Sequence, residues 1–118
     1  MSVVLVVDDD TDLRETLCDV LEAVGHATRS ARNGAEALRI LRADPSVDVV
    51  ILDLMMPVMT GWEFRVQQLS DASLAQIPVV VMTAAADLSK APIEAAQILS
   101  KPVTMQTLLA AIDTHARS

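Results

Sequence analysis

The chain has 118 residues, of which 52% are hydrophobic, enough for one domain with one core. Its net charge of −7 argues against a nucleic-acid or anionic-membrane partner for this domain, and one cysteine, Cys18, excludes a disulfide framework and a thiolate metal cluster. The apolar run at the N-terminus is too short, and too closely followed by acids, for a signal peptide or membrane span. We therefore expect a cytoplasmic protein with a single domain, residues 1–118.

The N-terminal part of the chain alternates apolar runs with helical stripes. Residues 3–7 are apolar and mostly β-branched, which predicts a strand buried in a parallel sheet. Apolar residues then recur at helical spacing as far as Gly25, and Thr11 is expected to cap this first helix. The next expected elements are a strand over 26–30, a turn at Asn33-Gly34 and a second helix ending near Asp44-Pro45.

The middle of the chain carries an apolar run, Val47 to Leu52, that stops at Asp53. A short apolar run bounded by turn residues predicts a strand buried on both faces. Packing gives no reason for such a strand to end on an acid. The carboxylate would lie at the carboxyl end of a central strand, where open α/β sheets bind ligands. The alternative is an aspartate that caps a helix from a loop.

The C-terminal part continues the alternation. A fourth helix is expected from about Asp87 to Ala96, and Pro92 should kink it or stand at its first position. Its neighbours are a third helix opening at Thr60-Gly61, a strand over 77–82 before Thr83, a strand at Ile98-Leu99 before Lys101, and a last helix capped by Thr104. The whole pattern predicts a flavodoxin-like α/β fold, (βα)5, with a doubly wound five-stranded parallel sheet and helices on both faces.

Four of the five expected strands end in a chemically useful side chain. Because the carboxyl ends of parallel strands share one edge, these side chains should converge: Asp8 and Asp9, Asp53, Thr83 and Lys101. Three carboxylates at close range repel one another, and a hard divalent cation such as Mg²⁺ relieves the repulsion through oxygen ligands. A carboxylate beside Mg²⁺ and a lysine can attack a phosphoryl group, with a threonine hydroxyl as hydrogen-bond donor. The predicted product is an aspartyl phosphate.

At these positions the chain resembles the CheY-like receiver domains of response regulators in two-component signalling. The resemblance covers nearly the whole chain, because the motifs occur in order at the expected strand ends. They are Val6-Val7-Asp8-Asp9-Asp10, Leu52-Asp53-Leu54-Met55-Met56-Pro57 with Gly61, Val81-Met82-Thr83-Ala84, and Ser100-Lys101-Pro102.

The resemblance implies a role for each residue of this set. Asp53 would accept the phosphoryl group from a phosphohistidine on a sensor histidine kinase or histidine phosphotransfer protein. Asp9 would bind Mg²⁺ (or Mn²⁺) directly and Asp8 mostly through water, with Asp53 and the backbone carbonyl of Met55 completing the protein ligands. Thr83 and Lys101 would bind the phosphoryl oxygens. The resemblance also implies a cis Lys101–Pro102 peptide, and a signalling domain with slow self-dephosphorylation rather than an enzyme.

The chain departs from the family in three ways. Ile98 stands where the family usually has a Tyr or Phe that swings inward on activation. The stretch from Thr83 to Lys101 is short by about one helical turn, so the fourth helix should be short or irregular, and the output face around it used differently or not at all. Met55 and Ala85, beside the opening to the phosphoryl group, are apolar, which predicts slow loss of phosphate.

Three other interpretations of the sequence compete with a phospho-accepting receiver. An aspartate-nucleophile phosphatase of the dehalogenase type fits the spacing of Asp8 and Asp10, but Asp12 stands where its threonine should be and no cap domain is present. A calcium loop fails because Leu13 takes the place of the turn glycine. A degenerate receiver that only binds protein stays open, although the complete set of site residues argues against it.

Overall fold

The computed structural model describes residues 1–88 and 93–117, with the backbone alone for Ala85 and Leu88. Within these residues the five-stranded, all-parallel sheet is confirmed, with the strand order β2-β1-β3-β4-β5. Its strands are β1 (Val3–Val7), β2 (Ala27–Ala31), β3 (Val49–Leu52), β4 (Val79–Thr83) and β5 (Gln97–Ser100). The helices are α1 (Thr11–Ala23), α2 (Gly34–Ala43), α3 (Gly61–Ser70), α4 (Ala85–Leu88) and α5 (Met105–His115).

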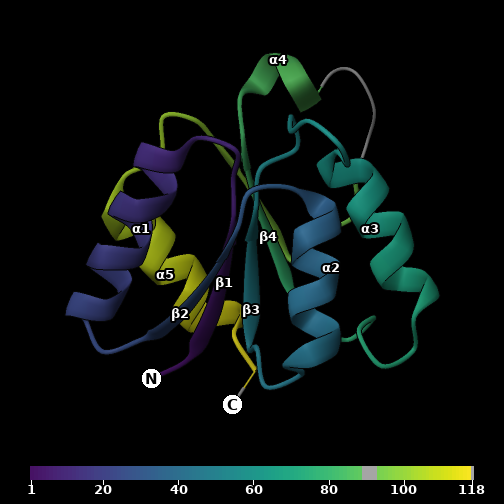
Figure 1. The fold of residues 1–118 in the computed structure, drawn as a ribbon. Helices are drawn as coiled ribbons and strands as arrows, with labels where there is room; N and C mark the ends of the chain where they lie inside the picture. Colours follow the sequence, from purple (N-terminus) through teal and green to yellow (C-terminus); the bar gives the residue numbers. More distant parts are fainter. Residues whose placement is uncertain (89–92, 118) are drawn as a thin grey trace.

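The helices cover both faces of the sheet, as the apolar strands require. Helices α1 and α5 pack on one face and α2 and α3 on the other (Figure 1). Successive strand residues feed the two cores in turn: Val4 and Val6 of β1 face α1 and α5, whereas Leu5 and Val7 face α2 and α3. This doubly wound arrangement is the predicted fold.

Helix caps fix where each chain segment turns back from the sheet. The expected cap at Thr11 is wrong: the side chain of Asp10 accepts from the Leu13 N–H, so the helix begins one residue earlier than a Thr11 cap allows. Asn33 caps α2 rather than forming a separate turn. The predicted helix start at Thr60-Gly61 is confirmed, and there Thr60 forms a capping box with Glu63. The predicted cap at Thr104 is also confirmed.

The fourth helix differs most from its prediction. Helix α4 begins at Ala85, two residues earlier than expected, and is described as far as Leu88. Residues 93–96, which were expected to be helical, are not. Residues 89–92, including the kink or helix start expected at Pro92, lie outside the described residues. Ile98 of β5 is 40% exposed, and its side chain lines an open groove beside α3 together with Arg65 and Ile93.

Both ends of the chain meet at Asp48, before β3. The Val3 N–H donates to Asp48 Oδ2 at 2.8 Å, and the Arg117 N–H donates to the Asp48 carbonyl at 3.0 Å. The Arg117 guanidinium adds bonds to the carbonyls of Pro45 and Val47. The ends therefore lie at the amino ends of the strands, opposite α4 (Figure 1). None of the described helices is long and apolar enough to cross a membrane.

Candidate functional site

Three carboxylates meet at the carboxyl edge of the sheet. Asp8 and Asp9 follow β1, Asp53 follows β3, and one oxygen of each lies within 4.8 Å of the others. Asp8 and Asp53 are 1% and 6% exposed, whereas Asp9 is exposed. The strand order explains the meeting: the chain winds outward in opposite directions from β1 and β3, and the crevice of a doubly wound sheet opens at that point. The predicted acidic cluster is thereby confirmed as a juxtaposition.

Among the described residues, one cation faces the buried carboxylates. Lys101 Nζ lies 3.7 Å from Asp8 Oδ2 and 3.8 Å from Asp53 Oδ1, so it attracts both without a close hydrogen bond to either. The backbone fixes its position, because the Lys101 N–H donates to the Thr83 carbonyl at 2.8 Å. The predicted cis peptide between Lys101 and Pro102 is confirmed.

The buried carboxyls are hard to ionise. Burial, followed by the charge of Asp8, raises the pKa of Asp53 to about 6, and Lys101 offsets only part of this increase. Burial likewise raises the pKa of Asp8, against a backbone hydrogen bond from Asp10 and the charge of Lys101. A second positive charge would therefore stabilise the ionised form of both groups.

Two buried polar atoms at this edge have no hydrogen-bond partner among the described residues. They are Asp8 Oδ2 and Thr83 Oγ1. Leaving a buried oxygen unsatisfied costs about 1–3 kcal/mol, so such atoms in a folded protein indicate a missing ligand. Carboxylate oxygens at this spacing, one of them orphaned, are the donor set of a hard divalent cation. The residues therefore fit a metal ion, and the Thr83 hydroxyl has a free proton to donate.

Two groups that hold Asp8 were not predicted from the sequence. The Asp10 N–H donates to Asp8 Oδ1 at 2.9 Å, and the Arg14 guanidinium donates to the Asp8 carbonyl at 2.7 Å. The position of Arg14 in the sequence could have indicated a contact of this kind. Arg14 is a cation near the N-terminus of a helix, where the helix dipole disfavours positive charge. Its contact with the strand end explains its presence there.

The loop after Asp53 closes the site on its other side. A Cβ on Gly61 would lie 2.7 Å from the Asp53 carbonyl oxygen, so only glycine lets α3 start this close. Val58 has a φ of 71°, and the Met59 N–H donates to the Pro57 carbonyl around it at 2.8 Å, which makes a strained γ-turn. The turn leaves the Val58 side chain 82% exposed.

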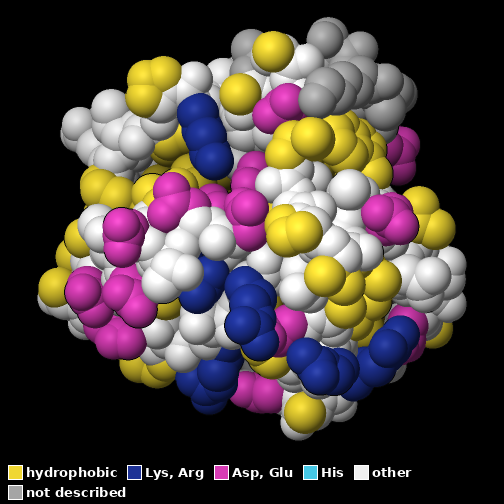
Figure 2. All heavy atoms as spheres, turned by 45° about the horizontal axis from the view of Figure 1, so that its top comes forward, with side chains coloured by type: hydrophobic (Ala, Val, Ile, Leu, Met, Phe, Trp, Pro, Cys, Tyr) yellow, Lys and Arg dark blue, Asp and Glu magenta, His cyan; other side chains and the backbone are white. Residues whose placement is uncertain are grey.

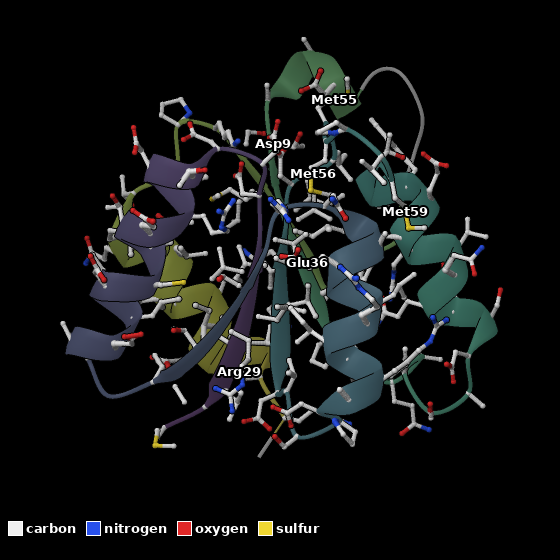
Figure 3. The ribbon with its side chains drawn as sticks, viewed as in Figure 1. Asp9, Arg29, Glu36, Met55, Met56 and Met59 are labelled. Carbon is white, nitrogen blue, oxygen red and sulfur yellow. The ribbon has the colours of Figure 1, made fainter. Side chains whose placement is uncertain are left out.

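Met55 lies between this turn and the acids. Its side chain is 40% exposed, and its backbone donates a hydrogen bond that lowers the pKa of Asp53. Figure 3 shows Met55 at the same end of the sheet as Asp9, beneath α4. Seen from this end, acidic side chains gather near the middle of the face, with hydrophobic side chains beside them (Figure 2). The side chain of Ala85, the other predicted flank, lies outside the described atoms.

Comparison with known proteins gives the site a family. The model of the response regulator receiver domain matches residues 4–113. Protein PilH of Pseudomonas aeruginosa is 32% identical over 118 residues, which cover 96% of each chain. Response regulator MprA of Mycolicibacterium vanbaalenii is 37% identical over 111 residues, but this chain spans only 47% of that protein.

A solved structure agrees in fold. The response regulator protein TrrA from Thermotoga maritima, in complex with Mg²⁺-BeF, superposes with a TM-score of 0.84 at 27% identity, covering 97% of this chain and 98% of its own. Family match, relative and fold concur with the motifs read from the sequence. The chain belongs to the response regulator receiver domain family of two-component systems.

Proposed function

We propose that this chain is a phospho-accepting receiver, one domain over residues 1–118, and that Asp53 is its phosphoryl acceptor. The observation that carries the proposal is the setting of Asp53: a buried carboxyl with a pKa of about 6, among two further acids and one lysine. A bound cation would lower this pKa and favour the ionised carboxylate, which is the form that attacks phosphorus. The proposal therefore couples phosphoryl transfer to cation binding.

The ion we propose is Mg²⁺, with Mn²⁺ as a substitute. Asp8, Asp9, Asp53 and the backbone carbonyl of Met55 would hold it. When bound, it supplies positive charge that lowers the pKa of the acids and neutralises the phosphoryl oxygens. The solved Mg²⁺-BeF complex of the similar TrrA supports this choice of metal.

The transfer step follows from the side chains. An Asp53 carboxylate oxygen attacks phosphorus while the phosphorus–nitrogen bond to the donor histidine breaks, and the electron pair of that bond returns to the imidazole. Lys101 attracts the phosphoryl oxygens with its ammonium group, which already faces Asp53; the side chain as a whole is 32% exposed. The Thr83 hydroxyl, buried without a partner among the described residues, donates a hydrogen bond to the same oxygens.

The donor we propose is a phosphohistidine on a sensor histidine kinase or histidine phosphotransfer protein. Its surface must come close, because Asp53 is only 6% exposed. Exposed side chains around Asp53 would meet it first, and Val58, in the loop after Asp53, is 82% exposed. The chain would act in the cytoplasm, where such kinases present their histidines, and would signal through a change of surface.

Phosphate uptake from a small donor tests the function. The protein is incubated with acetyl phosphate and Mg²⁺, and intact mass is recorded beside the Asp53→Asn variant. We expect one acid-stable, base-labile phosphoryl adduct on the wild type and none on the variant. An adduct of equal yield on the variant would contradict the assignment of Asp53.

The second candidate is a degenerate receiver that binds protein without phosphorylation. A complete acid set with an orphaned Asp8 oxygen disfavours it, since a pure binding module gains nothing from buried, repelling acids. Mg²⁺ binding without an adduct from acetyl phosphate or a phosphohistidine protein would favour this reading. The dehalogenase-type phosphatase is left without support, because the family match covers residues 4–113.

A further inference from the structure

The sulfur atoms of this chain differ sharply in their access to solvent. The Met55 side chain is 40% exposed, whereas Met56 and Met82 are 6% and 4% exposed. Cys18 is half-buried, and burial raises the pKa of its thiol, which keeps it protonated and slow to react with peroxides. Met1 is 90% exposed but lies at the opposite end of the molecule from the acids (Figure 1).

The exposed residue Met55 lies next to the proposed phosphoryl acceptor. Met55 follows Asp53 by two residues, and its backbone contacts the Asp53 carboxyl through a hydrogen bond. Met56, the next residue, packs in the core under α2 and α3, and Met59 is partly buried against Gly34. Figure 3 shows the three methionines along one loop, with Met55 uppermost beside Asp9. Among these three methionines, Met55 is therefore the one that an oxidant from solvent would meet first.

We propose that Met55 is a site of oxidation by hydroperoxides, and that its sulfoxide shortens the life of the phosphoryl group on Asp53. The inference rests on the proposed function. In the reaction the thioether sulfur takes one oxygen atom from the peroxide, the O–O bond is reduced, and water (or an alcohol, from an organic hydroperoxide) leaves. Sulfur loses two electrons, and no other residue is consumed.

The sulfoxide changes the chemistry at the mouth of the site. A thioether is a weak hydrogen-bond acceptor, whereas a sulfoxide oxygen is a strong one, and the side chain becomes polar. A water that donates to this oxygen is held beside the phosphorus with a lone pair free for attack. Hydrogen bonds of this kind change rates about two- to tenfold, so oxidation should shorten the half-life of the adduct by that factor.

The experiment combines oxidation mapping with phosphate lifetimes. Wild type, Met55→Leu and Met59→Leu are treated with limiting hydrogen peroxide, quenched with catalase, and loaded with acetyl phosphate and Mg²⁺. One tryptic peptide, residues 43–65, carries Met55, Met56 and Met59, so the mass of the peptide alone does not identify the oxidised residue. Fragment spectra of this peptide are therefore used to locate the added oxygen. Each protein is compared with its own untreated sample, so the baselines of the variants do not enter. Met59→Leu is the matched control, since it removes a neighbouring thioether and keeps Met55.

We expect oxygen on Met55 ahead of Met56 and Met59, and a shorter half-life after peroxide in wild type and Met59→Leu but not in Met55→Leu. Oxidation of Met56 or Met59 ahead of Met55 would overturn the proposal, as would an oxidised Met55 with an unchanged half-life. An equal response in Met55→Leu would overturn it too. Failure of the proposed function looks different, because untreated wild type would then take up no phosphoryl group at all.

Discussion

At the scale of a single residue, Asp53 stands out because its carboxyl is buried and its pKa is raised. Its pKa of about 6 lies above the ordinary value of 3.8, so between these values the folded chain binds a proton that the unfolded chain has lost. The free energy of unfolding of the metal-free protein must therefore fall as pH rises through this window. Two pKa units correspond to about 3 kcal/mol, an upper figure for this buried group.

Replacing Asp53 by Asn removes that dependence. In EDTA at pH 7.5 we expect Asp53→Asn to be more stable than wild type by about 1–3 kcal/mol, and at pH 4 the two should be equal. Urea unfolding at both pH values, followed by circular dichroism, measures the difference. Added Mg²⁺ should stabilise wild type at pH 7.5 and leave the variant much less affected. Stability curves that run parallel from pH 4 to 7.5 would refute this account of the carboxyl.

The side chain of residue 55 should affect how fast the phosphoryl group on Asp53 is lost. Asn at this position offers an amide that can orient an attacking water, which the thioether of Met55 does not. The half-life of the aspartyl phosphate in Met55→Asn should therefore be about two- to tenfold shorter than in wild type. Loss of the mass adduct over time, after removal of acetyl phosphate, gives the rate. Unchanged decay would show that the side chain of residue 55 does not reach the water.

The start of α3 shows how an element can hold the site. A Cβ at position 61 would meet backbone atoms, the Asp53 oxygen at 2.7 Å and Leu54 Cα at 2.8 Å, which cannot rotate away. Gly61→Ala should push the helix from the strand end and cost about 1–3 kcal/mol. Urea unfolding gives that cost, and a Mg²⁺ titration should show weaker binding in the variant. Wild-type stability in Gly61→Ala would mean that the helix start yields easily.

The end of α3 depends on one buried amide. Gln68 is fully buried, and its Nε2 donates to the carbonyls of Leu74 and Ile77 while its Oε1 accepts from Arg65. Gln68→Leu leaves these partners unsatisfied and should cost about 2–4 kcal/mol. Gln67→Leu, the same change at the exposed neighbour, should stay within about 0.5 kcal/mol. If chemical denaturation showed equal losses of unfolding free energy in the two variants, the hydrogen bonds of Gln68 would not be what stabilises the end of α3.

These elements also show what sequence could and could not predict. Strand β1 was predicted with its observed bounds, because five apolar residues ending on acids have one simple interpretation. The sequence could not distinguish Gln68 from Gln67, since the inward direction on α3 depends on the sheet, and the exposed side of that helix carries Val66 and Leu69. On α3 the polar Gln68 is buried while two apolar residues are exposed, so the pattern of apolar residues does not identify the buried face. Packing against the sheet determines which face is buried.

The site divides in the same way. The acids and Lys101 were predictable because parallel strands bring their carboxyl ends to one edge. The hydrogen bond from Arg14 to the Asp8 carbonyl and the positive φ of Val58 could not be predicted, because each depends on the path of a loop in three dimensions. Helix α4 was placed too late in the chain, since Ala84-Ala85-Ala86 has no polar cap to mark a start.

At the scale of the whole molecule, the region around α4 departs most from its prediction. Residues 93–96 are not helical and Ile98 is exposed, which differs from a face covered by a full helix. We expect the phosphorylated protein to make no dimer across α4, β5 and α5. Light scattering of the Mg²⁺-BeF-loaded protein, at micromolar to millimolar concentration, measures its mass. A dimer whose crystal structure shows an ordered, full-length fourth helix in the contact would end this expectation.

The meeting of both chain ends at Asp48 has a practical meaning for anyone who rebuilds this molecule. One residue ties the first strand to the segment after the last helix, at the edge of the sheet away from the acids. A fluorescent protein or surface anchor fused at either end therefore starts far from the acidic cluster. A short linker between the ends would give a circular chain, to be reopened in an exposed loop such as the one near Ser73.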